Sequence, residues 1–199
     1  VLIDGELIVG VGATSEFSNM TVDRVIDASG KWLIPGGIDV HTHMELPFGG
    51  TSAKDTFFTG TRAAAFGGTT TVVDFAVQSR GKSLREGLDA WHSKAEGHAA
   101  IDYGFHMIMS DVNNDTLKEM DTLVAEGIPD FKLFTAYPGV FFSDDGAIFR
   151  AMQQSGKNGG MIMMHAENGL AIDVIAADTV AAGVTDPIGH GLARYSGLE

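Results

Sequence analysis

The spacing of apolar segments constrains the fold of this chain more than any other feature. Strand-like runs begin near residues 35, 69, 101, 128 and 160, a step of roughly thirty residues, which is the size of one strand–helix unit. Helical stretches lie between them, and capping patterns at Ser52, Ser83 and Thr116 are typical of helix starts. Apolar strands that alternate with helices predict an α/β fold with a parallel sheet. The candidates are a (β/α)8 barrel and an open doubly wound sheet.

The first 34 residues follow a different pattern. Two apolar runs, 1–3 and 6–11, flank Asp4-Gly5 and predict a hairpin, and the segments 22–26 and 31–34 predict two further short strands. This is too little to form a domain alone. We therefore expect residues 1–34 to be part of a small β domain ahead of a barrel region at 35–199. The start at Val1, inside an apolar run and without a methionine, indicates a cut.

Composition excludes several functional classes. With 44% hydrophobic residues the chain can bury a core, and a net charge of -13 argues against nucleic acid or an anionic membrane as partner. There is no cysteine, so any metal must be held by other side chains. No apolar run approaches the ~18 residues of a membrane span, and a cytoplasmic location is expected.

Two histidines end the first predicted barrel strand, at His41 and His43. Side chains two residues apart in a strand point to the same face, so both imidazoles can reach one metal ion. The alternative is a pair of histidines hydrogen-bonded in a core. Lys132 lies inside the fourth strand and His165 ends the fifth. This spread over strands one, four and five favours the barrel, because an open sheet gathers its ligands at one switch point.

A lysine within a buried strand needs an explanation. The ammonium of Lys132 is costly there unless it is paired, modified or reaches the barrel mouth. As an ammonium it cannot bind a metal. If its neutral amine adds CO2, the resulting carbamate is an anionic bridge with two oxygens. We interpret the remaining histidines, His92, His98, His106 and His190, as structural, and Met161, Met163 and Met164 as core residues.

These residues stand in stretches that resemble a known family. The segment GGIDVHTH at 36–43 looks like the metal-binding opening of the amidohydrolase superfamily. The segments MELPFGGT at 44–51, FFTGTRAAAFGGTT at 57–70, FKLFTAY at 131–137 and HAENG at 165–169 are similar to its dihydropyrimidinase and hydantoinase branch. The resemblance covers nearly the whole chain.

The resemblance implies a binuclear zinc site in a barrel, with a small β-sandwich built from both chain ends. His41 and His43 would bind the more buried metal, a carbamate on Lys132 would bridge the pair, and His165 would bind the second metal. Tyr137 would hydrogen-bond the substrate carbonyl oxygen as it becomes an oxyanion. The apolar Met44, Leu46, Phe48 and the 140–142 loop would shape the pocket.

The implied activity is hydrolysis of a cyclic ureide or imide, such as a dihydropyrimidine or a 5-substituted hydantoin, by a metal-bridging hydroxide. Alternatives are an allantoinase-like or dihydroorotase-like enzyme, or a non-catalytic scaffold of the same fold. Members of the branch are usually cytoplasmic homo-oligomers, often tetramers. The family also needs a histidine after the sixth strand and an aspartate after the eighth. We expect this chain to hold about five units of the barrel and to be inactive alone.

Overall fold

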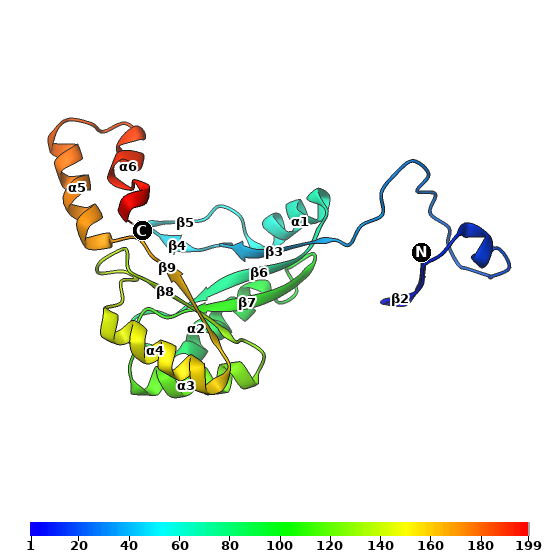
Figure 1. Ribbon diagram of the computed structural model, residues 1–199, viewed down its shortest axis with the longest axis horizontal. Coiled ribbons are helices and arrows are strands. Elements are labelled where there is room, and N and C mark those ends of the chain that lie inside the picture. The colour runs from blue at the N-terminus through cyan, green and yellow to red at the C-terminus, as the bar shows by residue number, and fades with distance from the viewer. Residues whose placement is uncertain (199) are drawn as a thin grey trace. The chain divides into compact units, whose positions relative to one another are not determined.

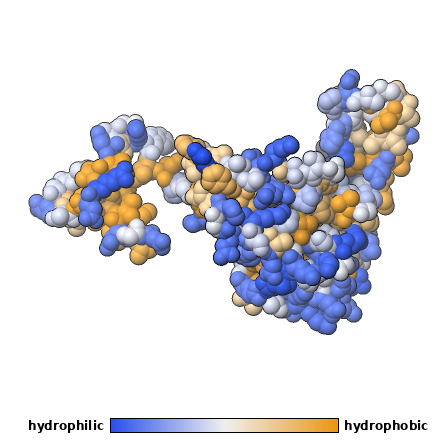
Figure 2. Space-filling view, turned by 180° about the vertical axis from the view of Figure 1, so that it is seen from behind, coloured by the Kyte–Doolittle hydropathy of each residue, from blue (hydrophilic) through white to orange (hydrophobic). Residues whose placement is uncertain are grey.

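The structure, a computed structural model, describes residues 1–198, which form two compact units that divide between Pro35 and Gly36. Within these residues no helix is both long enough and apolar enough to cross a bilayer. Exposed apolar side chains are visible over the N-terminal unit and over the last two α-helices (Figure 2).

The N-terminal unit contains the predicted hairpin. Strand β1 (Leu2–Asp4) pairs antiparallel with β2 (Leu7–Gly10), and a short 3-10 helix, η1 (Thr14–Phe17), follows. The turn uses Gly5 at a φ of 58°, a left-handed conformation that glycine adopts without a steric penalty. The hairpin prediction is confirmed.

The two further strands predicted in this unit are wrong for the described residues, because neither 22–26 nor 31–34 forms a strand. A strand needs a neighbour to bond its backbone N–H and C=O groups, and the only pair within the unit is the hairpin itself. The apolar side chains of these segments accordingly stay in solvent: Val25 is 81% exposed and Trp32 is 93% exposed.

The second unit is built on one five-stranded parallel sheet (Figure 1). Its strands are β3 (Gly37–Thr42), β6 (Thr69–Val77), β7 (Asp102–Ile108), β8 (Asp130–Phe134) and β9 (Met161–His165). They lie side by side in the order in which they occur in the chain, and each neighbouring pair is parallel. All five predicted barrel strands are therefore present, without the reversal of order that marks a doubly wound sheet.

The arrangement of the helices distinguishes a barrel from an open doubly wound sheet. They are α1 (Phe57–Gly67), α2 (Leu84–Ala95), α3 (Asn114–Ala125), α4 (Asp145–Asn158), α5 (Gly169–Ala181) and α6 (Ile188–Ala193). Helix α1 contacts α2, α2 contacts α3, and α3 contacts α4, so these four helices cover the same face of the sheet. A doubly wound fold places helices on both faces. A sheet covered on one face by successive crossover helices is the wall of a (β/α)8 barrel, and the barrel prediction is confirmed.

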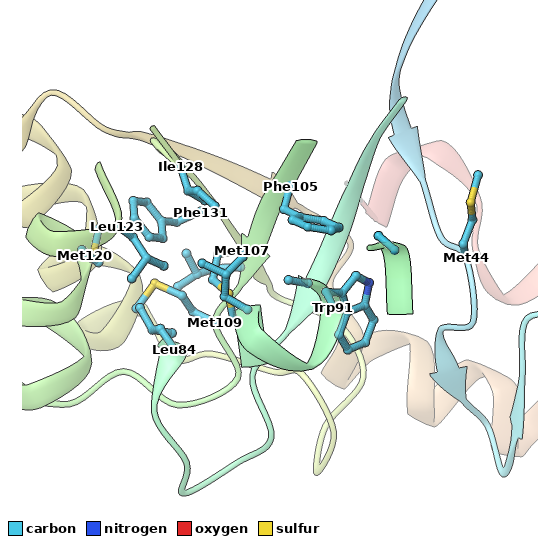
Figure 3. Packing of buried hydrophobic residues seen from close by; sticks show 14 of the residues in the cluster. Met44, Leu84, Trp91, Phe105, Met107, Met109, Met120, Leu123, Ile128 and Phe131 are labelled. Carbon is cyan, nitrogen blue, oxygen red and sulfur yellow. The ribbon is translucent and has the colours of Figure 1, made fainter. Parts of the chain in front are cut away.

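Two apolar layers lie on the two faces of the sheet. On the helix side, a large cluster joins alternate strand residues to the helices; Phe105, Met107, Phe131, Leu84 and Trp91 belong to it (Figure 3). On the opposite face, a smaller cluster contains Phe75, Ile108, Phe134 and Phe141. The period of two along each strand thus separates the helix-packing face from an inner face, which carries the candidate site.

Helix starts were predicted less accurately than strands. Ser83 caps α2 as predicted, with its hydroxyl accepting from the backbone N–H of Glu86 at 3.0 Å. The other two patterns are wrong: Thr56 caps α1 and Asn113 caps α3. Ser52 instead lies in the two-residue strand β5 (Thr51–Ser52), which pairs with β4 (Pro47–Phe48).

The two outer strands of the sheet expose apolar side chains. Ile38 and Val40 of β3 are 66% and 56% exposed, and Met161 of β9 is 60% exposed. The prediction that Met161 belongs to the core is therefore wrong, whereas Met163 and Met164 pack against the inner and outer clusters respectively. A short 3-10 helix, η2 (Ser196–Leu198), ends the described chain.

Candidate metal centre

The predicted site residues lie near the carboxyl ends of three strands. His41 is in β3 and His43 directly follows it, Lys132 is in β8, and His165 is the last residue of β9. Tyr137 follows β8 by three residues. This is the end of the sheet at which α/β barrels carry their chemistry.

The ring of Phe75, in β6, is the platform for the first half of the site. The rings of His41 and His43 lie 4.7 and 4.9 Å from it, centroid to centroid, and 5.1 Å from each other. The Nζ of Lys132 lies 5.8 Å from the same ring. One buried aromatic residue thus gathers the two histidines of β3 and the lysine of β8.

Phe134, two residues beyond Lys132, is the platform for the second half. Its ring stacks on that of His165 at 5.4 Å, and the ring of Tyr137 lies 6.0 Å away. The Nζ of Lys132 is 5.5 Å from this ring as well, so the lysine lies between the two platforms. The structure therefore gathers all five predicted residues on the inner face.

Lys132 is the least ordinary member of the group. The residue is 9% exposed, and within residues 1–198 its ammonium makes no ion pair or hydrogen bond. Burial lowers its pKa below the ordinary value. A lysine in this condition carries a larger fraction of neutral amine, the form that can react with CO2.

The neutral form, which binds metals, is favoured for both His41 and His43. Burial is the largest influence on both and lowers their pKa values, and the positive charge of nearby Lys132 adds to the effect. Neutral imidazole has a free nitrogen lone pair, whereas imidazolium has none. In addition, Nδ1 of His43 is buried without a hydrogen-bond partner in the described structure. Such an orphaned nitrogen fits a site that gains a further group.

His165 has one nitrogen engaged and one left over. Its Nε2 lies 2.5 Å from Oε2 of Glu167, whose other oxygen is 3.8 Å from Nε of Arg194. A carboxylate on one ring nitrogen is the usual partner of a metal-bound histidine, because it fixes the ring and raises its basicity. Nδ1 is the nitrogen that this contact leaves for a metal.

His106 was predicted to be structural, and it lies closer to the site than that prediction implies. Its ring is 4.8 Å from that of Phe75, and its Nε2 is 3.0 Å from the carbonyl oxygen of Val40. Its Nδ1 is 3.1 Å from Oδ2 of Asp130, without the alignment of a hydrogen bond. His106 therefore supports the backbone just before His41, a role that sequence gave no sign of because Val40 is remote in the chain.

Tyr137 occupies a strained position at the edge of the site. Its φ is 59°, a left-handed value that is rare for a side chain of this size. Its carbonyl oxygen accepts hydrogen bonds from the backbone N–H groups of Val140 and Phe141 at 3.0 and 3.1 Å, which hold this conformation. Burial, with the nearby carboxylate of Glu167, raises the pKa of the phenol. The hydroxyl therefore remains a hydrogen-bond donor at neutral pH.

The residues fit a metal pair only on one condition. Among the described residues, no three His, Cys, Asp or Glu side chains are clustered closely enough to hold a metal ion. Two histidines from β3 and one from β9 are separated by a lysine rather than by a carboxylate. A carbamate on Lys132 would supply the missing anionic oxygens in that place.

A one-sided helical layer on a parallel sheet, with histidines at the carboxyl ends of its strands, defines a (β/α)8 barrel with a candidate metal site. Comparison with known families agrees: the amidohydrolase family model matches residues 32–189. The chain belongs to the amidohydrolase family.

Within this family, the chain is similar to hydantoinases and dihydropyrimidinases. A D-hydantoinase of Streptomyces coelicolor is 65% identical over 201 residues, which cover 100% of this chain and 43% of the relative. A dihydropyrimidinase of Rattus norvegicus is 39% identical, over 88% of this chain and 34% of the relative. The chain thus spans less than half the length of these relatives.

Solved structures show the same likeness. A D-hydantoinase from Bacillus sp. AR9 superposes with a TM-score of 0.92 at 44% identity, over 99% of this chain and 42% of that one. A dihydropyrimidinase from Brevibacillus agri superposes with a TM-score of 0.88 at 47% identity, over 90% of this chain and 39% of that one.

Proposed function

We propose that a complete protein containing this chain hydrolyses the amide bond of a cyclic ureide or imide, a dihydropyrimidine or a 5-substituted hydantoin. The observation that carries the proposal is the convergence of two histidines, a buried unpaired lysine and a third histidine around Phe75 and Phe134. Relatives with hydantoinase and dihydropyrimidinase names support this class of substrate. They do not favour an allantoinase-like enzyme, a dihydroorotase-like enzyme or a non-catalytic scaffold.

Two divalent metal ions, proposed to be zinc, would be held by four residues: His41, His43, His165 and Lys132 as its carbamate. When bound, the ions would polarise the substrate carbonyl and activate water for attack. The carbamate would form when the lone pair of Nζ bonds to the carbon of CO2 and one proton passes from the nitrogen to water. Burial of the lysine favours this step because it raises the fraction of neutral amine.

The remaining residues would position the substrate. Tyr137 would donate its hydroxyl proton in a hydrogen bond to the carbonyl oxygen as negative charge develops there. Beside it, the ring of Phe48 from β4 lies 5.0 Å from that of Tyr137 and 6.0 Å from that of Phe141. These rings form an apolar wall that suits a ring substituent without charge. We further propose that the complete protein is a cytoplasmic homo-oligomer, a tetramer, with no nucleic-acid or membrane partner.

The test uses the full-length protein. It is purified with zinc and assayed against hydantoin, a 5-substituted hydantoin, dihydrouracil, allantoin and dihydroorotate, with metal content measured by elemental analysis. We expect two metals per chain and turnover of the first three compounds. Zinc-free, folded protein without activity would support the scaffold instead. Preference for allantoin or dihydroorotate would replace the substrate assignment while retaining the site.

A further inference from the structure

A buried carboxylate that plays no part in the proposed chemistry holds the segment that carries His41 and His43. Asp74, in β6, has 0% of its surface exposed. Its Oδ2 accepts from the hydroxyl of Thr42 and from the backbone N–H of Met44, both at 2.8 Å. Its Oδ1 accepts from the indole N–H of Trp91 and from the N–H of Phe75, both at 2.9 Å. These four hydrogen bonds satisfy both oxygens of the buried carboxyl group.

This carboxylate and the candidate site lie on opposite faces of the same two strands. Thr42, between the two histidines, bonds Asp74, whereas the rings of His41 and His43 contact Phe75, the next residue along β6. Because successive strand residues alternate between faces, fixing Thr42 on the helix side directs both imidazoles to the inner side. One contact on the outside therefore orients two rings on the inside.

The strand needs such a contact at this point because its ladder is interrupted. The pairing of β3 with β6 shifts register between Asp39 and Thr42 and resumes where Thr42 faces Asp74. Inside the irregular stretch, Oδ1 of Asp39 accepts from the N–H of His41 at 3.1 Å. Beyond it, the bond from Met44 to Asp74 ties down the chain just after His43. The two histidines thus lie between anchored positions, although regular ladder bonds are missing.

We propose that Asp74 is a positioning residue for the metal pair, acting through Thr42 and Met44, and that the indole of Trp91 links it to α2. This inference rests on the proposed function, because it assigns Asp74 the task of setting the geometry of His41 and His43 for metal. Asp74 itself touches neither metal nor substrate. Its expected signature is a loss of metal affinity larger than the loss of fold stability would produce.

The test is made on the full-length protein. Replacing Asp74 itself removes four hydrogen bonds at once and threatens folding, so the informative variant is Thr42→Val, which keeps the shape and removes only the hydroxyl. Thr42→Ser restores the hydroxyl and is the matched rescue. Asn113→Ala, which removes the N-cap of α3 on a different element, is the control for lost stability alone. The dissociation constant of zinc is measured by competition with a chelator, alongside the melting temperature, kcat and KM.

We expect Thr42→Val to weaken zinc binding and lower kcat by about 10–100-fold, the range typical of residues outside the ligand set that orient the metal ligands. KM should change little, and Thr42→Ser should restore most of the affinity. Asn113→Ala should lower the melting temperature without changing the zinc dissociation constant. Unchanged zinc affinity in Thr42→Val, or an equal loss in Asn113→Ala, overturns the role of Asp74 alone. Wild-type protein that binds no zinc overturns the proposed function together with it.

Discussion

At the scale of single residues, the lowered pKa of Lys132 leads to a specific prediction about pH. Burial lowers its pKa from the ordinary 10.5, so the neutral amine becomes the major form at a lower pH than for a lysine in water. Below that lowered pKa the ammonium predominates and cannot add CO2. Metal-free full-length protein should therefore regain activity faster as pH rises, at a fixed concentration of dissolved CO2 and zinc, and the midpoint of this rise should lie below pH 10.5.

The variant Lys132→Ala tests the carbamate assignment independently of pH. The variant should lose most of its bound metal, and short carboxylates or bicarbonate should partly restore activity by taking the place of the carbamate. Metal content is measured by elemental analysis after dialysis. A variant with full metal content and full activity, or reactivation of the wild type that ignores pH, would remove the carbamate from the assignment.

Tyr137 should act in the transition state rather than in binding. Loss of its hydroxyl in Tyr137→Phe should lower kcat by about 10²–10³-fold, the effect of removing one oxyanion donor, while the metals stay in place. Steady-state kinetics with a 5-substituted hydantoin give the two parameters separately. A change confined to KM would instead identify a group that binds the ground state.

Residue types explain which members of the site could be predicted from sequence. His41, His43, Lys132 and His165 are recognisable because such side chains are rare at the ends and interiors of apolar strands. Asp74 was missed, since its partners Thr42 and Met44 are about thirty residues away in the chain and only the sheet brings them together. The predicted roles of His41, His43, Lys132 and His165 stay predictions.

At the scale of elements, periodicity predicted the strands better than capping patterns predicted the helix starts. Apolar runs at a step of roughly thirty residues depend on burial, which the whole fold enforces. A Ser/Thr-x-x-Asp/Glu pattern is short and recurs by chance. Two of the three helix starts predicted from it therefore lie three or four residues away from the observed N-caps. The strands predicted at 22–26 and 31–34 failed for a third reason: strands need partners, and the described unit offers none. We propose that 1–34 joins a β-sandwich completed by other segments.

The contact between α2 and β6 gives an element-scale prediction. A Cβ added at Gly87 would lie 2.7 Å from the carbonyl oxygen of Val77 and 2.8 Å from the methyl carbon of Met107. Gly87→Ala should therefore destabilise the full-length protein by about 1–3 kcal/mol, because the helix must move away from the strand. Its matched control is Gly156→Ala in α4, where an added Cβ meets nothing within 4 Å. There the higher helix propensity of alanine should stabilise by up to about 1 kcal/mol. Equal effects of the two changes in denaturant unfolding would contradict the close packing of α2.

At the scale of the whole molecule, the open sides of the sheet govern how the isolated segment should behave. Strands β3 and β9 each have one unpaired side among the described residues, and their apolar side chains reach solvent. Such edges favour aggregation. Residues 1–199 expressed alone should therefore be aggregation-prone, should bind at most one metal per chain, and should hydrolyse neither dihydrouracil nor hydantoin above background. Static light scattering, zinc analysis and substrate assays test this directly. A monodisperse, active segment with two metals would contradict the assignment of ligands made here.

The strand order β3-β6-β7-β8-β9 also bears on how the protein is made. Each later strand of this sheet pairs with the sheet strand synthesised before it, so every strand after β3 already has one partner when it leaves the ribosome. The site residues then arrive in chain order: Phe75 of β6 comes before Lys132 and Phe134 of β8, and His165 of β9 follows. Pairings between consecutive units keep loop-closure costs low and permit growth during translation. Ribosome-bound chains stalled at successive lengths should therefore gain protease resistance stepwise, one strand–helix unit at a time.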